Sequence, residues 1–280
     1  MPHRRTRTRV GLVGCGAIGT ALARVIERDY SHVARIVAVT DLNPTRASAL
    51  HHRLAGHPQI LPLSRLIQRS HLVIEAASVA ASAGVARAAL AAHRDVMVMS
   101  SGGLRIDGSW RRALSRSRGR LCVPSGALGG LDAVKALAAG SIRRVRLTTR
   151  KPPQALASAP GLRMAPRQLL RLRRPRTVFE GTPLQTVRAF PQNTNVAATL
   201  ALALMGARRG RRAIPITVRV IADPAIRRNS HELEVDAACG RLRCTAESRP
   251  SLMNPKTSET AIHSAAAALR QWFEPIRIGT

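Results

Sequence analysis

The chain has 280 residues, of which 45% are hydrophobic and only 2% aromatic, so we expect two domains, or one with an elaboration, around a sizeable aliphatic core. No apolar run reaches the roughly 18–20 residues of a membrane span, and no signal-peptide stretch follows the basic N-terminus, which predicts a soluble cytoplasmic protein without a membrane partner. The net charge of +30 is almost wholly arginine scattered along the chain, which argues against a cognate nucleic acid but leaves nonspecific attraction to polyanions open.

Strands are expected to alternate with helices through the N-terminal half. Short apolar runs predict buried strands, and alanine-rich or amphipathic segments between them predict helices. The expected strands are 9–13, 36–41, 72–76, 95–99 and 121–124, and the expected helices are 18–27, 45–54 and 79–93. This order predicts an α/β fold with an N-terminal Rossmann domain, a doubly wound parallel sheet, over residues 1–125.

The pattern changes after Gly126, which predicts a second, α+β domain over residues 126–256. Its mostly antiparallel strands are expected at 145–149, near Val187, and at 216–221, 231–235 and 241–245, with helices at 131–139 and 195–204. The segment 155–176 is rich in arginine and proline and predicts a mobile loop. An amphipathic helix over 257–273 is expected to pack back on the first domain.

A glycine motif follows the first expected strand and opens a helix. In Gly14-x-Gly16-x-x-Gly19 the first glycine allows a tight turn, the second lets the backbone approach a pyrophosphate, and the third allows close packing of helix on strand. Asp41 ends the next strand, where an acidic side chain bonds the ribose hydroxyls. The alternative is a tight turn in some other α/β protein. The predicted cofactor contacts are Gly14, Gly16, Ala17, Ile18, Gly19 and Asp41.

The acidic residue also bears on the choice of cofactor. The charge of Asp41 would repel the 2′-phosphate of NADP, which favours NAD. Arg46 follows closely and could offset that repulsion, so NADP remains possible. No metal is predicted, because the four cysteines form no C-x-x-C pair and no set with histidine at zinc spacing.

Several segments, in the same order from about residue 9 to residue 273, resemble the L-aspartate dehydrogenase family. The first, at 11–19, is generic to Rossmann enzymes, whereas the later ones are specific to this family. The later segments are 124–133 (PSGALGGLDA), 149–153 (TRKPP), 179–182 (FEGT), 190–200 (FPQNTNVAATL), 222–224 (ADP), 229–232 (NSHE) and 254–258 (NPKTS).

The resemblance implies a reaction and an assembly. The reaction is reversible oxidative deamination of L-aspartate to iminoaspartate and then to oxaloacetate and ammonia, with NAD or NADP, and it can feed NAD biosynthesis. The second domain would bind substrate and form a homodimer. The family's catalytic histidine matches His231, and its cofactor contacts match Ala127 and one asparagine of 193–195, of which Asn195 is favoured over Asn193.

The residues themselves are compatible with these roles. Histidine has an ordinary pKa of about 6.5, which suits proton transfer. Asn193 and Asn195 precede an expected helix, where N-capping is the alternative to cofactor binding. Residues 256–258 are expected to open the last helix, where N–H groups and a cation suit a carboxylate, although a simple capping segment is the alternative. The predicted substrate contacts are Asn229, Lys256, Thr257 and Ser258.

Two other functions stay open at this point. One is a Rossmann oxidoreductase that acts on a different amino acid or on a semialdehyde. The other is a dinucleotide-binding redox sensor without turnover, for which an intact His231 would be unnecessary.

Overall fold

The structure is a computed structural model that describes residues 7–191, 195–205, 208–209, 212–251, 254–276 and 278–279. For residues 208–209, 212–213 and 254–257 it describes the backbone only. The chain divides into two units, Met1–Pro124 with Ala265–Arg277 and Ser125–Ser264 with Ile278–Thr280. No helix in the described part of the chain combines the length and apolar character that a membrane crossing needs.

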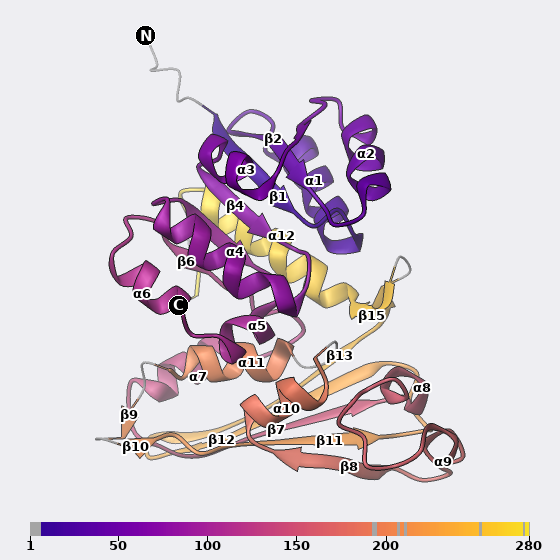
Figure 1. Ribbon diagram of the computed structural model, residues 1–280. Coiled ribbons are helices and arrows are strands. Elements are labelled where there is room, and N and C mark those ends of the chain that lie inside the picture. The colour runs from indigo at the N-terminus through magenta and orange to yellow at the C-terminus, as the bar shows by residue number, and fades with distance from the viewer. Residues whose placement is uncertain are drawn as a thin grey trace. The chain divides into compact units, whose positions relative to one another are not determined.

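The first unit is built on a six-stranded parallel sheet in the order β3-β2-β1-β4-β5-β6 (Figure 1). This is the strand order of a Rossmann fold, and it confirms the predicted doubly wound sheet. The strands are β1 (Thr8–Val13), β2 (Ala34–Thr40), β3 (Gln59–Ile60), β4 (Leu72–Glu75), β5 (Asp95–Val98) and β6 (Leu121–Cys122). The helices are α1 (Ala17–Asp29), α2 (Pro44–Arg53), α3 (Leu63–Arg69), α4 (Val79–Ala91), α5 (Ser101–Ile106) and α6 (Trp110–Ser115).

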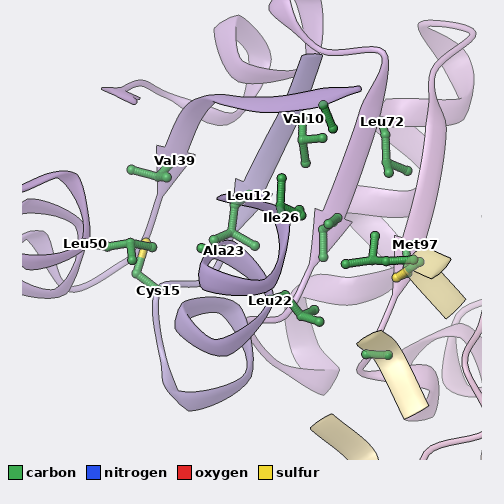
Figure 2. Packing of buried hydrophobic residues seen from close by; sticks show 14 of the residues in the cluster. Val10, Leu12, Cys15, Leu22, Ala23, Ile26, Val39, Leu50, Leu72 and Met97 are labelled. Carbon is green, nitrogen blue, oxygen red and sulfur yellow. The ribbon is translucent and has the colours of Figure 1, made fainter. Parts of the chain in front are cut away.

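Aliphatic side chains from strands and helices form the core of this unit. Figure 2 shows Val10 and Leu12 of β1, Leu72 of β4 and Ile26 of α1, each at most 1% exposed. The C-terminal part of α12 (Glu259–Phe273) adds fully buried side chains to the same core. Because aromatic residues are scarce, branched aliphatic side chains supply most of the buried area that stabilises the sheet.

The second unit holds a five-stranded sheet in the order β13-β12-β7-β11-β8. Its pairings are antiparallel except between β7 and β11, so the sheet is mixed and mostly antiparallel, as predicted. The strands are β7 (Ile142–Lys151), β8 (Arg176–Gly181), β11 (Ile216–Ala222), β12 (Asn229–Ala237) and β13 (Gly240–Ser248), and two short pairs are β9 (Arg208–Arg209) with β10 (Arg212–Ala213) and β14 (Pro250–Ser251) with β15 (Asn254–Ser258). The helices are α7 (Leu131–Ala138), α8 (Pro153–Leu156), α9 (Pro166–Leu170), α10 (Pro183–Ala189) and α11 (Asn195–Ala203).

One face of this sheet changes from apolar to polar along its length. Helices α7, α10 and α11 lie on that face (Figure 1), and alternation along β7 and β12 turns every second side chain towards them. On β7, Val145 and Leu147 are fully buried in a core that also contains Val134 of α7 and Leu200 of α11. Further along the two strands, the same alternation places buried polar side chains on this face, and those side chains form the candidate site.

Two predictions for the sheet region of this unit were wrong, besides the start of the last helix, which is described with the candidate site. The segment 155–176 is not a structureless loop, because α9 and the end of α8 lie within it and Leu156 and Leu169 are fully buried in a small core with Phe190. The strand expected near Val187 is helix α10, which begins with a capping box and a proline in its first turn. In both places a proline in the first turn starts a helix, although the sequence of the segment indicated a loop or a strand.

Candidate active site

The glycine turn between β1 and α1 has the geometry of a dinucleotide cradle. Gly14 has a φ of +98°, and a Cβ atom there would lie 2.5 Å from the carbonyl oxygen of Ala76. A Cβ atom on Gly19 would collide with the carbonyl oxygen of Gly14, so α1 can pack on the turn only with glycine at this position. Gly16 faces open space. The turn therefore leaves backbone accessible beside a helix N-terminus, where a pyrophosphate binds.

Asp41 follows β2 directly, and backbone donors fix its carboxylate. The N–H of Cys15 donates to Oδ2 at 2.7 Å, and the N–H of Asn43 donates to Oδ1 at 2.8 Å. Each carboxylate oxygen keeps a lone pair for a ribose hydroxyl. Burial and the neighbouring Asp41 carboxylate raise the pKa of the Cys15 thiol to about 12, so this thiol stays protonated beside the cradle.

A pocket of about 540 Å³ opens where these elements meet. It lies at the carboxyl ends of β1, β2 and β4, which include the switch point of the sheet, the place where doubly wound folds bind ligands. Arg46 of α2 lines the same pocket, so a cation stands near the carboxylate of Asp41. Of the predicted residues, Gly14, Gly16 and Asp41 line this pocket, and Ala17, Ile18 and Gly19 form the first turn of α1.

Glu75, which sequence reasoning missed, is fully buried at the end of β4. Its Oε1 accepts hydrogen bonds from the N–H groups of Ala77 and Ser78 at 2.9 and 3.1 Å, and its Oε2 accepts one from Ser100 N–H at 3.0 Å. Burial raises the pKa of this carboxyl, and the backbone donors oppose the rise. Since Ala77 and Ser78 line the pocket, Glu75 holds one wall of it in place.

His231 lies on β12 in a row of buried polar side chains. Its partner across the ladder is Thr149 of β7, whose Oγ1 lies 3.1 Å from Nδ1 of His231. Two positions further along the same face, Lys151 ends β7 and Asn229 begins β12, and each is 4% exposed. The sheet thus brings an imidazole, an ammonium, an amide and a hydroxyl to one face of the second unit.

Burial sets the charge of this row. Burial, and then the nearby Lys151 ammonium, lower the pKa of His231 to about 3, so the imidazole is neutral at physiological pH. Burial also lowers the pKa of Lys151 to about 8, which leaves that side chain mainly protonated. The ordinary histidine pKa assumed from the sequence therefore does not apply: the ligand-free site holds a neutral base beside a cation.

Hydroxyl groups extend the row beyond Asn229. Ser248 of β13 pairs with Asn229 in the ladder, and its Oγ hydrogen-bonds to Oγ of Ser258. Thr260 donates to the same Ser248 oxygen through Oγ1 at 2.8 Å. Ser258 is 9% exposed. Of the four predicted substrate contacts, the structure therefore links Asn229 and Ser258 to the row that contains His231.

The expected start of the last helix is a strand instead. Residues 254–258 form β15, which pairs antiparallel with β14, and α12 begins at Glu259. Lys256 and Thr257 therefore do not open the helix, because their segment pairs with β14 as a strand. The side chains of Lys256 and Thr257 lie outside what the structure describes.

In the second unit, the described residues that the resemblance assigns to cofactor binding, Ala127 and Asn195, lie in or next to the apolar core of that unit. Ala127 is 6% exposed and belongs to the same core cluster as Val196. Asn195 precedes Val196 as the exposed first residue of α11. Asn193 lies outside the described residues.

Sequence reasoning assigned no role to Thr149, Lys151 or Ser248. A signal was present for the first two, since they continue the every-second-residue pattern of Val145 and Leu147 onto the same face. No local signal marked Ser248, whose burial depends on contacts with Ser258 and Thr260.

Two family models match successive parts of the chain. The family described as "Aspartate dehydrogenase, C-terminal" matches residues 132–272, and "Homoserine dehydrogenase, NAD binding domain" matches residues 14–118. An L-aspartate dehydrogenase of Methanocella arvoryzae is 39% identical over 275 residues, covering 97% of this chain and 99% of that protein, and one of Bradyrhizobium diazoefficiens is 36% identical over 273 residues, covering 97% and 94%.

A solved structure shares the fold. The crystal structure of an aspartate dehydrogenase from Thermotoga maritima superposes with a TM-score of 0.68 at 24% identity, covering 98% of this chain and all of that one. Together with the near full-length sequence relatives, the family match over the second unit shows that this chain belongs to the aspartate dehydrogenase family.

Proposed function

We propose that this chain catalyses NAD(P)-dependent oxidative deamination of L-aspartate to iminoaspartate, which hydrolyses to oxaloacetate and ammonia. The observation that carries the proposal is His231, a buried, neutral imidazole fixed by Thr149 on the same sheet face as the Lys151 ammonium. Family membership supports the same reaction, because the relatives named L-aspartate dehydrogenase span nearly the whole chain.

The first unit fits the cofactor. The open backbone at Gly16 would face the pyrophosphate, and the oriented carboxylate of Asp41 would bond the ribose hydroxyls. When bound, the nicotinamide ring supplies the acceptor for the hydride that leaves Cα of aspartate. Asp41 favours NAD, and Arg46 in the same pocket allows NADP to bind as well.

The neutral imidazole suits the proton steps. Before the Cα hydrogen leaves with two electrons, the ammonium group of the substrate must lose one proton, so that the nitrogen lone pair can form the C=N bond of the protonated imine. His231 can accept a proton because it is uncharged, and its contact with Thr149 through Nδ1 leaves Nε2 for the substrate. In the hydrolysis that follows, the same imidazole can take a proton from water and return one to the departing ammonia.

A substrate screen tests the proposal and separates it from its alternatives. Purified protein is mixed with NAD or NADP and with L-aspartate, L-glutamate, L-alanine or aspartate semialdehyde, and reduced cofactor is followed by absorbance. We expect turnover with L-aspartate far above that with L-glutamate. Turnover only with another substrate would support the alternative oxidoreductase, and NADH binding without turnover on any substrate would support the redox sensor.

The second unit is also proposed to form a homodimer. The sheet face opposite α7, α10 and α11 carries a ladder of paired charges, including Arg146 with Glu234 at 3.6 Å and Arg219 with Glu180 at 2.8 Å. Such a broad face can meet its own copy across a two-fold axis. Sedimentation should show a dimer at micromolar concentration, and a stable monomer there would refute the assembly.

We further propose a cytoplasmic enzyme whose iminoaspartate feeds NAD biosynthesis, with no cognate nucleic acid or membrane partner. The four cysteines are free thiols, as expected in a reducing compartment. Nitrogen-labelled aspartate should label the pyridine ring of NAD more strongly in cells that make the protein, and equal labelling would remove the biosynthetic role. Sequence-selective DNA or RNA binding that survives physiological salt would contradict the absence of a nucleic-acid partner.

A further inference from the structure

A buried lysine belongs to the polar row of the second unit, and the proton steps proposed for His231 do not use it. Lys151 is 4% exposed and lies on the same face of β7 as the fully buried Val145 and Leu147. Lysine is almost never buried to this extent, because its ammonium group loses its hydration there. Methionine or leucine would fill the same space at lower cost. The charge itself therefore has a role at this position.

The neighbours of Lys151 are those of a ligand site. Ser230 pairs with Arg150 in the β7–β12 ladder, so Asn229 and Lys151 occupy the next positions of the two strands. His231 lies one step back on the same face, close enough for the Lys151 charge to lower the imidazole pKa. An amide donor, a cation and a proton acceptor thus lie together at the strand ends.

We propose that the ammonium of Lys151 binds a carboxylate of the substrate beside His231. The inference rests on the proposed function, because L-aspartate brings two carboxylates into the site. A charge-assisted hydrogen bond between ammonium and carboxylate would offset the loss of hydration and would hold the amino acid with its nitrogen towards the imidazole. Lys151 would then select for a dicarboxylate amino acid, because a substrate with an apolar side chain carries no second carboxylate for the ammonium to bind.

The charge state of the site supports this role over that of a second base. Because burial lowers the pKa of Lys151 only to about 8, the group is mainly an ammonium at neutral pH. Arg150 pairs with Asp223 at 3.9 Å, and His231 is neutral. Carboxylate affinity should therefore fall as the pH rises past about 8, when the amine loses its proton.

The test compares Lys151→Met with a control, Lys135→Met, which removes a partly exposed cation of α7 that pairs with Asp132. Methionine keeps an unbranched apolar side chain and removes the charge. We expect the KM for aspartate to rise about tenfold to a hundredfold in Lys151→Met, with the KM for NAD unchanged and no effect in Lys135→Met. Succinate, a dicarboxylate without an amino group, should lose affinity for the NADH-loaded protein by the same factor in calorimetry.

A pH series on the wild type adds a readout that a structural role would not move. The dissociation constant of succinate should rise severalfold between about pH 7 and about pH 10, where its own carboxylates stay ionised. Unchanged succinate affinity in Lys151→Met, or a flat pH series, would overturn the role of Lys151. If Lys151→Met fails to fold, the wild-type series decides alone. Wild-type protein that binds succinate but never oxidises aspartate would refute the proposed reaction and leave the carboxylate site intact.

Discussion

Replacing His231 with asparagine should make the protein less sensitive to acid while removing most of its turnover. Burial lowers the pKa of this imidazole from 6.5 to about 3, so between these values the unfolded chain binds a proton that the folded chain excludes. The stability that His231 contributes is therefore complete above about pH 6.5 and is lost as the pH falls towards 3. At pH 5, about 1.5 units below 6.5, the loss is about 2 kcal/mol at about 1.36 kcal/mol per unit.

The assay is urea unfolding of wild type and His231→Asn at pH 7 and at pH 5. Between these pH values the wild type should lose about 2 kcal/mol more of its free energy of unfolding than the variant. The comparison cancels the other histidines, because both proteins contain them, and it cancels the lost contact with Thr149, because that loss affects the variant equally at the two pH values. Equal losses in the two proteins would show that burial does not hold His231 neutral.

The same variant tests the proton role. Removing a general acid–base group costs roughly 10²–10⁴-fold in rate, so kcat for aspartate should fall by that range. NADH affinity should stay near normal, because the cradle and Asp41 belong to the first unit. Nearly full turnover by His231→Asn would mean that the histidine is structural. If His231→Asn loses both folding and NADH binding, the histidine supports the fold of the domain instead.

Two further changes concern the cofactor pocket. Asp41→Ala should raise the kcat/KM ratio of NADP to NAD by about tenfold, the value of one unfavourable charge contact of about 1.4 kcal/mol, and an unchanged ratio in steady-state kinetics would show that Arg46 already governs the choice. Gly19→Ala should lower the free energy of unfolding by about 1–3 kcal/mol and weaken NADH binding, because the new methyl group meets the carbonyl of Gly14. Gly84→Ala is the matched control, since a Cβ there meets nothing within 4 Å, and thermal unfolding should find it neutral or stabilising; equal effects of the two changes would contradict the steric argument.

The cofactor half of the molecule could be predicted from sequence because its signals are local. The glycine turn, the strand before it and the acid after the next strand lie within one short stretch of chain, and each spacing has a direct geometric meaning. Glu75 escaped notice because its role depends on backbone donors from Ser78 and Ser100, and Ser100 lies on the next crossover. Helices α3, α5 and α6 were missed because short helices carry little periodicity.

The candidate site of the second unit depends on contacts that are distant in sequence. His231 was identified through family resemblance, but its neutrality follows from burial and from the nearby Lys151 ammonium, and neither of these is local in sequence. The polar residues 256–258 also suit a helix cap, and only the pairing of β15 with β14 distinguishes a strand from a helix start there. Lys151 could have been placed by alternation, but its charge state could not, because desolvation is a property of the packed unit.

The shared face of β7 and β12 ties the folding of the second unit to the alignment of the polar side chains in the candidate site. The strand that buries Leu147 presents Thr149 two residues later and Lys151 four residues later, so a slip of one residue would turn both polar side chains to the opposite face. The buried aliphatic residues at one end of the strands therefore fix the strand register, and with it the positions of the polar side chains at the other end. Substitutions at Leu147 or Leu233 would therefore alter turnover by shifting these polar side chains, although neither leucine belongs to the polar row itself.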